Sequence, residues 1–155
     1  MKLNIKKLIL CLAIPLAVGG LSALLSGGMG SYRTLSQPPL SPPGWVFPIV
    51  WTVLYLLMGY ASYRVAVSEA PKTQVRQALI YYAAQLAVNF IWSPIFFGLE
   101  LRLLAFIVLL VLWLLVCLTL HRFSAIDEPA GDLLLPYILW ITFAGYLNLG
   151  VYLLN

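Results

Sequence analysis

Charged side chains are scarce in this sequence. Only 9% of its 155 residues are Asp, Glu, Lys or Arg, whereas a soluble globular domain carries about 25%. Hydrophobic residues make up 63% of the chain and the mean hydropathy is +0.97. So few polar groups cannot cover so much apolar surface in water, which excludes an ordinary soluble domain. The length predicts a single domain, and the composition predicts that it lies in a lipid bilayer.

Further shortages exclude classes of function. The net charge of +4 comes from scattered Lys and Arg, and without a basic face no nucleic-acid partner is predicted. The single histidine, His121, and the two cysteines, Cys11 and Cys117, have no metal-ligand spacing, so no metal site is predicted. The cysteines are interpreted as small buried hydrophobes. No charged residue lies well inside a hydrophobic stretch, which argues against a pump or a proton-coupled carrier.

The few charges divide the chain into uncharged stretches that are long enough to cross a bilayer. They contain 25, 30, 23, 18 and 23 residues, at 8–32, 34–63, 77–99, 103–120 and 133–155. A membrane-spanning helix needs about 20 residues, and a backbone in lipid must satisfy its own hydrogen bonds. The sequence therefore predicts an all-α bundle of five transmembrane helices, near Ile5–Leu25, Trp45–Val67, Gln77–Phe97, Leu101–Leu120 and Leu133–Leu154.

The basic residues predict the orientation of the chain. With the N-terminus in the cytoplasm, seven of the nine Lys and Arg lie on the cytoplasmic side, and two, Arg33 and Arg102, lie on the other. The positive-inside rule therefore places the C-terminus outside. The basic start of the chain is also typical of a secretory signal. However, the apolar run 8–25 exceeds the usual core of such a signal and no A-x-A-like site follows, which favours a retained helix.

The connection 26–44 is the longest between the predicted helices. Glycines in its first half end the first helix, and four prolines in its second half make the backbone stiff and extended. It also carries Tyr32 and Leu35. Two interpretations remain open: a linker, or a preformed lid over the mouth of the bundle.

The third helix has one polar and aromatic face. Gln85, Asn89, Trp92 and Phe96 follow one another at helical spacing, and neighbouring amides avoid lipid, so this face should point into the bundle. On the opposite face, Ala83 and Ala87 form a small-xxx-small pattern. That pattern is consistent with a helix contact in a dimer and, equally, with the ordinary abundance of alanine in membrane helices.

Two other helices carry aromatic faces. The second helix places Phe47, Trp51 and Tyr55 one turn apart, and the fifth places Trp140 one turn before Ala144. Aromatic rings, a few amides and a small residue are consistent with a pocket for a flat apolar ligand. Ordinary packing explains the same spacing, so it does not decide between the two.

Three segments of the chain resemble the TspO/translocator protein family, also called tryptophan-rich sensory protein or peripheral-type benzodiazepine receptor. They read PPGWVFPIVWTVLYLLMGYASY at 42–63, AAQLAVNFIWSPIFFG at 83–98 and LLPYILWITFAGYLN at 134–148. Pro15, Gly19 and Gly20 in the first helix also fit. The chain is therefore identified as a bacterial member of this family, located in the cell membrane.

The resemblance implies a five-helix bundle, commonly a homodimer, whose cavity is closed by the first loop. It implies porphyrins, such as protoporphyrin IX and haem, as ligands, with no required cofactor. It assigns the pocket to Tyr32, Phe47, Pro48, Trp51, Tyr55, Asn89, Trp92, Leu104, Trp140, Phe143, Ala144 and Leu147. The resemblance also implies a second activity, because some bacterial members degrade protoporphyrin in light with tryptophans that match Trp51 and Trp140. These two are therefore the candidate catalytic residues.

The chain departs from the family pattern at two places. Leu40 stands where the loop of the family usually carries a tryptophan, which removes one ring from the lid. Tyr152 is followed by Leu153, Leu154 and Asn155 rather than by a basic residue, so the C-terminal cholesterol motif is incomplete and no cholesterol recognition is predicted from it. The sequence predicts a membrane receptor or sensor for tetrapyrroles. A light-dependent porphyrin-degrading enzyme and a passive transporter of lipophiles are the alternatives.

Overall fold

The computed structural model describes residues 3–27 and 34–155, and its regular structure over these ranges is entirely helical. The elements are α1 (Ile5–Leu25), α3 (Val46–Ala66), α4 (Lys72–Ser93), the π-helical turn η1 (Pro94–Gly98), α5 (Arg102–Ile126), α6 (Glu128–Asp132) and α7 (Leu135–Leu154). Five helical segments are long and apolar enough to cross a membrane, with α4 continuing into η1 and α6 into α7. The prediction of an all-α bundle with five membrane-spanning helices is confirmed.

The helix bounds differ from the sequence prediction where charged residues prolong a helix beyond its apolar stretch. The first helix has the predicted bounds. Helix α4 begins at Lys72, directly after Pro71, rather than at Gln77, and α5 continues through His121 to Ile126 rather than ending at Leu120. A charged residue marks where a helix leaves lipid, not where its backbone hydrogen bonds end, so the charges located the spans better than the helix ends.

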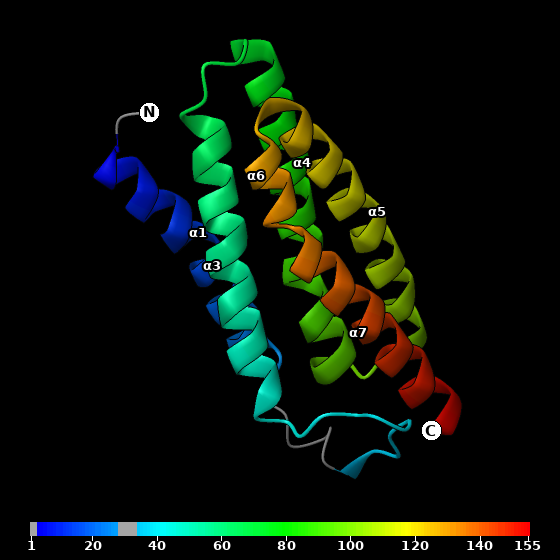
Figure 1. Ribbon diagram of the computed structural model, residues 1–155. Helices are drawn as coiled ribbons and strands as arrows, with labels where there is room; N and C mark the ends of the chain where they lie inside the picture. The colour runs from blue at the N-terminus through cyan, green and yellow to red at the C-terminus, as the bar shows by residue number, and fades with distance from the viewer. Residues whose placement is uncertain (1–2, 28–33) are drawn as a thin grey trace.

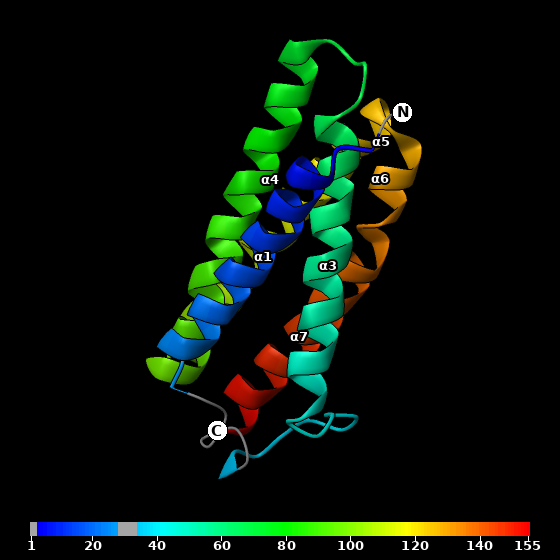
Figure 2. The same cartoon turned by 90° about the vertical axis from the view of Figure 1, so that its left-hand side faces the viewer.

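The five segments run up and down between two ends of the bundle (Figures 1 and 2). The end with the N-terminus, the α3–α4 connection and α6 is called the N-terminal end. The opposite end, with residues 34–44 and the C-terminus, is called the loop end. Helix α1 packs against α3 and α4, and α5 packs between α4 and α7. Helices α3 and α7 are joined mainly by aromatic side chains rather than by close backbone contact.

Two prolines explain how α1 attaches to its neighbours. A proline has no N–H, so the carbonyl four residues earlier loses its helix partner. Pro15 frees the Cys11 oxygen, which lies against Gly59 of α3 so closely that an added Cβ would be 2.7 Å away. Pro94 frees the Phe90 oxygen, which accepts a hydrogen bond from Ser22 Oγ at 2.8 Å.

The predicted inner face of α4 is confirmed. Gln85, Asn89, Trp92 and Phe96 are all buried, with between 1% and 8% of their surface exposed. Ala83 and Ala87 are exposed on the outside of the bundle. The amides of α4 therefore face its interior, as their cost in lipid requires.

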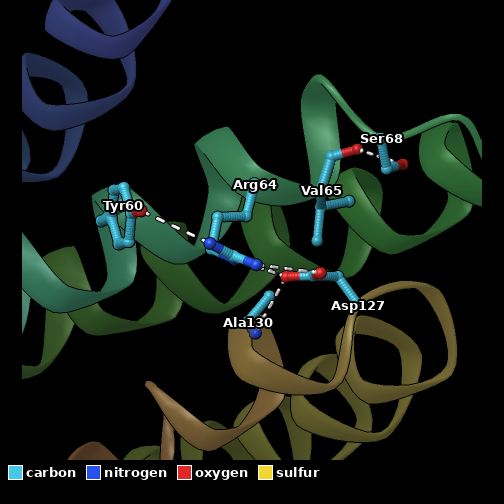
Figure 3. Close-up of polar contacts among 6 residues, drawn as sticks. All are labelled: Tyr60, Arg64, Val65, Ser68, Asp127 and Ala130. Atoms are coloured by element: carbon cyan, nitrogen blue, oxygen red, sulfur yellow. Dashed lines mark hydrogen bonds and ion pairs between the residues drawn. The ribbon is translucent and has the colours of Figure 1, made fainter. Parts of the chain in front are cut away.

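An ion pair ties three elements together at the N-terminal end (Figure 3). Arg64 of α3 donates from Nε and Nη2 to the two carboxylate oxygens of Asp127, at 2.6 and 3.3 Å. Asp127 ends α5 and caps α6 by accepting from the Ala130 amide at 3.2 Å. The side chains of Arg64 and Asp127 are only 25% and 17% exposed, so this bidentate pair fixes α3 to the α5–α6 corner.

The described part of the loop, residues 34–44, is attached to the loop end of α7. Tyr146 donates to the Pro39 carbonyl at 2.6 Å, and the Asn155 amide exchanges hydrogen bonds with the backbone of Ser36. Pro38 lies so close to Gly150 that an added Cβ would be 2.5 Å from the proline ring. Leu40 is 85% exposed, so the side chain at the position of the family tryptophan points away from the bundle.

Candidate functional site

A cavity of about 320 Å³ lies between α1, α3 and α4, in the half of the bundle nearer the loop end. This volume is at the lower end of the range for small-molecule pockets, about 300–1,000 Å³. Its lining comes from three stretches of the chain: Leu16, Gly19, Gly20, Ser22, Ala23 and Ser26 of α1 and its cap; Phe47, Pro48, Trp51, Thr52 and Tyr55 of α3; and Asn89, Trp92, Ser93 and Phe97 of α4 and η1. Aromatic rings and small polar groups dominate it.

Tyr55 and Asn89 of the lining belong to a chain of buried hydrogen bonds. Tyr55 donates to Asn89 Oδ1 at 2.8 Å, and Asn89 Nδ2 donates to the Tyr137 hydroxyl at 2.7 Å. Tyr137 then donates to Gln85 Oε1 at 2.7 Å, and the Gln85 amide points at the sulfur of Met58 at 3.9 Å. All the bonds run in one direction, from the cavity into the core. The chain therefore fixes the rotamers of Tyr55 and Asn89 before any ligand arrives.

The opposite side of the cavity is made by serines. Ser26 Oγ donates to the Ser22 carbonyl at 2.6 Å and lies 2.7 Å from Ser93 Oγ. Ser22 Oγ bonds to the Phe90 carbonyl that Pro94 leaves free. These bonds join α1 to α4 along one edge of the cavity and keep small polar groups beside the aromatic rings.

An aromatic partition, formed by Phe47, Trp51 and Trp140, closes the cavity toward α7. Trp51 stacks on Tyr55, with ring centroids 5.6 Å apart, and meets Trp140 edge-on at 6.5 Å. Phe47 also meets Trp140 edge-on, at 5.8 Å. The two indoles are therefore in contact across α3 and α7.

Behind the partition lies a second hollow, an apolar groove of about 470 Å³ between α3 and α7. Trp140 and Phe143 line it together with aliphatic residues of α3. The Trp140 indole nitrogen is buried and has no hydrogen-bond partner among the residues that the structure describes. The partition thus separates a cavity with polar groups from a groove that is almost wholly apolar.

The structure distributes the predicted pocket residues over several places. Phe47, Pro48, Trp51, Tyr55, Asn89 and Trp92 line the cavity, and Trp140 and Phe143 line the groove behind the partition. Ala144 and Leu147 are 5% exposed and belong to the buried interior, and Leu104 lines a separate hollow at the loop end of α5 and α7. Tyr32 lies outside the described residues. Six of the twelve therefore share one cavity.

The α1 side of the cavity was not predicted from the sequence. Apart from Leu16, its residues are small, namely Gly19, Gly20, Ser22, Ala23 and Ser26, and such residues in a membrane helix usually indicate helix packing. A signal was nevertheless present. Ser22 and Ser26 follow one another by one turn, and two hydroxyls on one face of an apolar helix have to find partners inside the protein.

The lining favours binding over acid–base chemistry. It contains no Asp, Glu, Lys, Arg, His or Cys, and no group of three or more potential metal ligands occurs within residues 3–27 and 34–155. A flat apolar ring system can stack its faces on the aromatic rings of such a lining. Of the side chains that ligate haem iron, the lining contains only Tyr55, whose hydroxyl donates to Asn89 Oδ1 at 2.8 Å.

Comparison with known proteins places this chain in a family. The sequence model of the TspO/MBR family matches residues 11–154. The chain is 37% identical over its whole length to tryptophan-rich protein TspO of Chlorobaculum tepidum, covering 99% of that protein. It is 45% identical to the tryptophan-rich sensory protein of Cereibacter sphaeroides, over 80% of this chain and 76% of the relative. It is also 37% identical to the translocator protein of Bos taurus, over 87% and 82%.

Proposed function

Because the chain belongs to the TspO/MBR family, we propose that this integral membrane protein is a receptor or sensor that binds tetrapyrroles, such as protoporphyrin IX or haem, in the cavity between α1, α3 and α4. The family membership and the five apolar helices make it a membrane protein of the sensory and translocator type. The ligand and the receptor role are the proposal.

The observation that carries the proposal is the aromatic lining of the cavity. Trp51 and Trp92 present indole rings, and Phe47 and Phe97 add two more rings at the loop side. Stacking of a flat ligand on one aromatic ring contributes about 1–3 kcal/mol in nucleic-acid complexes, and a tetrapyrrole face should gain a similar amount. A cavity of about 320 Å³ encloses only part of a tetrapyrrole, so the rest of the macrocycle extends toward the loop.

A titration with protoporphyrin IX in nanodiscs, followed by tryptophan fluorescence, tests the proposal. Gly20 lines the cavity, and an added Cβ there would meet nothing within 4 Å. The backbone therefore accepts a side chain at this position, and the ring of Gly20→Phe should obstruct the cavity. We expect quenching in the native protein and at least about tenfold weaker binding in Gly20→Phe, the equivalent of about 1.4 kcal/mol.

Leu24→Phe is the matched control, because Leu24 lies on the same helix, is 79% exposed and does not line the cavity. It should bind as the native protein does. Quenching that is equal in all three proteins would show that porphyrin binds elsewhere or only to the lipid.

The contact between Trp51 and Trp140 supports a second candidate, light-dependent degradation of protoporphyrin IX. Two indoles 6.5 Å apart are the groups that this activity would use. Trp51→Phe and Trp140→Phe keep a ring at each position but remove most of its redox capacity. If the protein is an enzyme, porphyrin absorbance should fall in light faster than in a detergent control, and the double variant should lose this difference. A receptor should show no such difference while retaining binding.

Orientation and assembly complete the proposal. The distribution of basic residues supports a cytoplasmic N-terminus and an external C-terminus in a bacterial cell membrane, and the two termini lie at opposite ends of the bundle (Figure 1). A C-terminal reporter should therefore be active outside the cytoplasm and one at Pro71 inside.

The exposed Ala83 and Ala87 support a homodimer through α4, which Ala83→Leu should weaken in cross-linking.

A further inference from the structure

The hydroxyl groups around the cavity share one property: their protons already have acceptors inside the protein. Ser22 Oγ donates to the Phe90 carbonyl at 2.8 Å, Thr52 Oγ1 to the Pro48 carbonyl at 2.7 Å, and Tyr55 to Asn89 Oδ1 at 2.8 Å. A hydroxyl carries one proton and two lone pairs. These three groups can therefore meet a ligand only as acceptors.

The serine pair follows the same logic. Ser26 Oγ uses its single proton on the Ser22 carbonyl, at 2.6 Å. The 2.7 Å bond between Ser26 Oγ and Ser93 Oγ must then be donated by Ser93. Both protons of this pair are committed, and lone pairs remain on both oxygens.

Few donors are left on the lining. The Trp92 indole donates to Asn148 Oδ1 at 3.1 Å, and one Asn89 N–H goes to Tyr137. The donors without a partner among the described residues are the Trp51 indole and the second Asn89 N–H. Against these two stand five hydroxyl oxygens, and no cationic side chain lines the cavity.

The helices themselves fix the direction of these hydroxyl protons, and a ligand can hardly reverse it. Thr52 and Ser26 bond to the carbonyl four residues earlier, a local arrangement that membrane helices favour. Ser22 bonds to the carbonyl that Pro94 leaves free. If a ligand turned the Ser22 hydroxyl toward itself, the Phe90 oxygen would be left buried without a donor, which is unfavourable in an apolar surrounding.

We propose that the cavity selects its ligand by hydrogen-bond polarity: among neutral flat molecules it binds most tightly those that donate an N–H or O–H to its hydroxyl oxygens, and it does not admit a carboxylate. A carboxylate has only acceptor oxygens and would lose its water for at most two donors, the Trp51 indole and the second Asn89 N–H, and no cation. Any acidic substituent of a bound tetrapyrrole must then remain outside the cavity, toward the loop end. Because the N–H groups of a porphyrin point to the centre of its ring, the enclosed part of the macrocycle is held by stacking alone. This inference rests on the proposed function in one respect, that ligands bind in this cavity.

Three pyrene probes test the selection without relying on a porphyrin. 1-Pyrenemethanol donates a hydrogen bond, 1-(methoxymethyl)pyrene is neutral without a donor, and 1-pyrenecarboxylate is an anion with acceptors only. Energy transfer from tryptophan to pyrene is measured in nanodiscs, and only the signal that Gly20→Phe abolishes is counted as cavity binding. This subtraction removes the contribution of probe that is dissolved in the lipid.

We expect the alcohol to bind most tightly. The affinity of the ether should be lower by a factor of up to about ten, and that of the carboxylate lower again by a factor of at least about ten. Ala23 lines the cavity near the end of α1 and is exposed, so Ala23→Arg adds a cation and several donors there. In this variant the ratio of the alcohol affinity to the carboxylate affinity should fall by a factor of at least about ten. Leu24→Arg, outside the lining, should leave the order of the probes unchanged.

Carboxylate binding in the native protein that equals or exceeds binding of the alcohol would overturn the inference. Equal affinities of alcohol and ether would overturn the claim for a donated hydrogen bond. A cavity signal that is absent for all three probes would overturn it as well. If protoporphyrin IX fails to bind while the pyrene order holds, only the proposed ligand is wrong. If protoporphyrin IX binds but its dimethyl ester binds at least tenfold more weakly, the selection rule is wrong and the proposed function stands.

Discussion

At the N-terminal end, α1 and α3 touch through backbone atoms, whereas at the loop end aromatic rings and a cavity hold them apart. Gly59 lies against the Cys11 carbonyl, but Gly20, farther along α1, has nothing within 4 Å of an added Cβ. Between them, the Tyr55 ring occupies the space beside Gly19. Two helices can thus form a tight seam and a binding cavity along one interface, because the size of the side chains between them changes along it.

The two ends also differ in how they are closed. The N-terminal end is fixed by the ion pair of Arg64 with Asp127 (Figure 3). The loop end is covered by residues 34–44, which neutral hydrogen bonds attach to Tyr146 and Asn155. Charge-assisted bidentate bonds are stronger than neutral ones. The N-terminal end should therefore contribute more to the free energy of unfolding, and the loop end should change conformation more easily.

The largest effect should come from Gly59→Ala. The added methyl group would lie 2.7 Å from a backbone oxygen that cannot move by rotamer change, so we expect a loss of about 3 kcal/mol of stability, the upper part of the range for overpacking. Thermal unfolding in detergent, followed by tryptophan fluorescence, measures it. Gly145→Ala is the control, since its nearest neighbour would be 3.8 Å away. Equal stability of the two variants would refute the tight seam.

Arg64→Ala should be the next most damaging change. It leaves Asp127 largely buried without its partner, and removal of one partner of a fully buried pair costs about 3–5 kcal/mol. Because the two side chains are 25% and 17% exposed, we expect about 2 kcal/mol in the same unfolding measurement. Arg76→Ala, at an exposed position, should change little. A similar loss in both variants would mean that the pair contributes nothing specific.

Tyr146→Phe should have a smaller and local effect. It removes one neutral hydrogen bond, to the Pro39 carbonyl, which contributes about 1 kcal/mol. Amide hydrogen exchange in residues 34–44 should become faster while exchange in α3 and α4 stays unchanged. If exchange in the loop does not respond, the contact with Tyr146 does not hold the loop.

Gly20→Ala should have the smallest effect, of opposite sign. Alanine is favoured over glycine within a helix by up to about 1 kcal/mol, and the cavity has room for the methyl group. We expect a gain of about 0.5 kcal/mol in unfolding, together with ligand affinity within a factor of about two of the native value. A destabilised protein would show that the space beside Gly20 is filled.

Sequence reasoning succeeded where a single helix carries the information. The spans follow from runs of uncharged residues, and the inner face of α4 follows from amides at helical spacing. The resemblance at 42–63 and 83–98 named six residues that share one cavity. In the rest of the chain the resemblance assigned Trp140, Phe143, Ala144, Leu147 and Leu104 to the pocket, and the structure places them in three other surroundings. The packing of α5 and α7 against their neighbours decides which hollow such a side chain lines.

The sequence by itself determined that this chain spans a membrane five times as helices, since lipid cannot satisfy an open backbone and the few charges leave no other choice. Only the tertiary structure decided where α1 lies, which acceptors receive the cavity hydroxyl protons and that Trp51 meets Trp140. These depend on contacts between residues far apart in the chain, such as Ser22 with Phe90 and Tyr55 with Asn89. The physical reason is that hydropathy acts on each helix alone, whereas a hydrogen bond between helices exists only once their packing has set the distance.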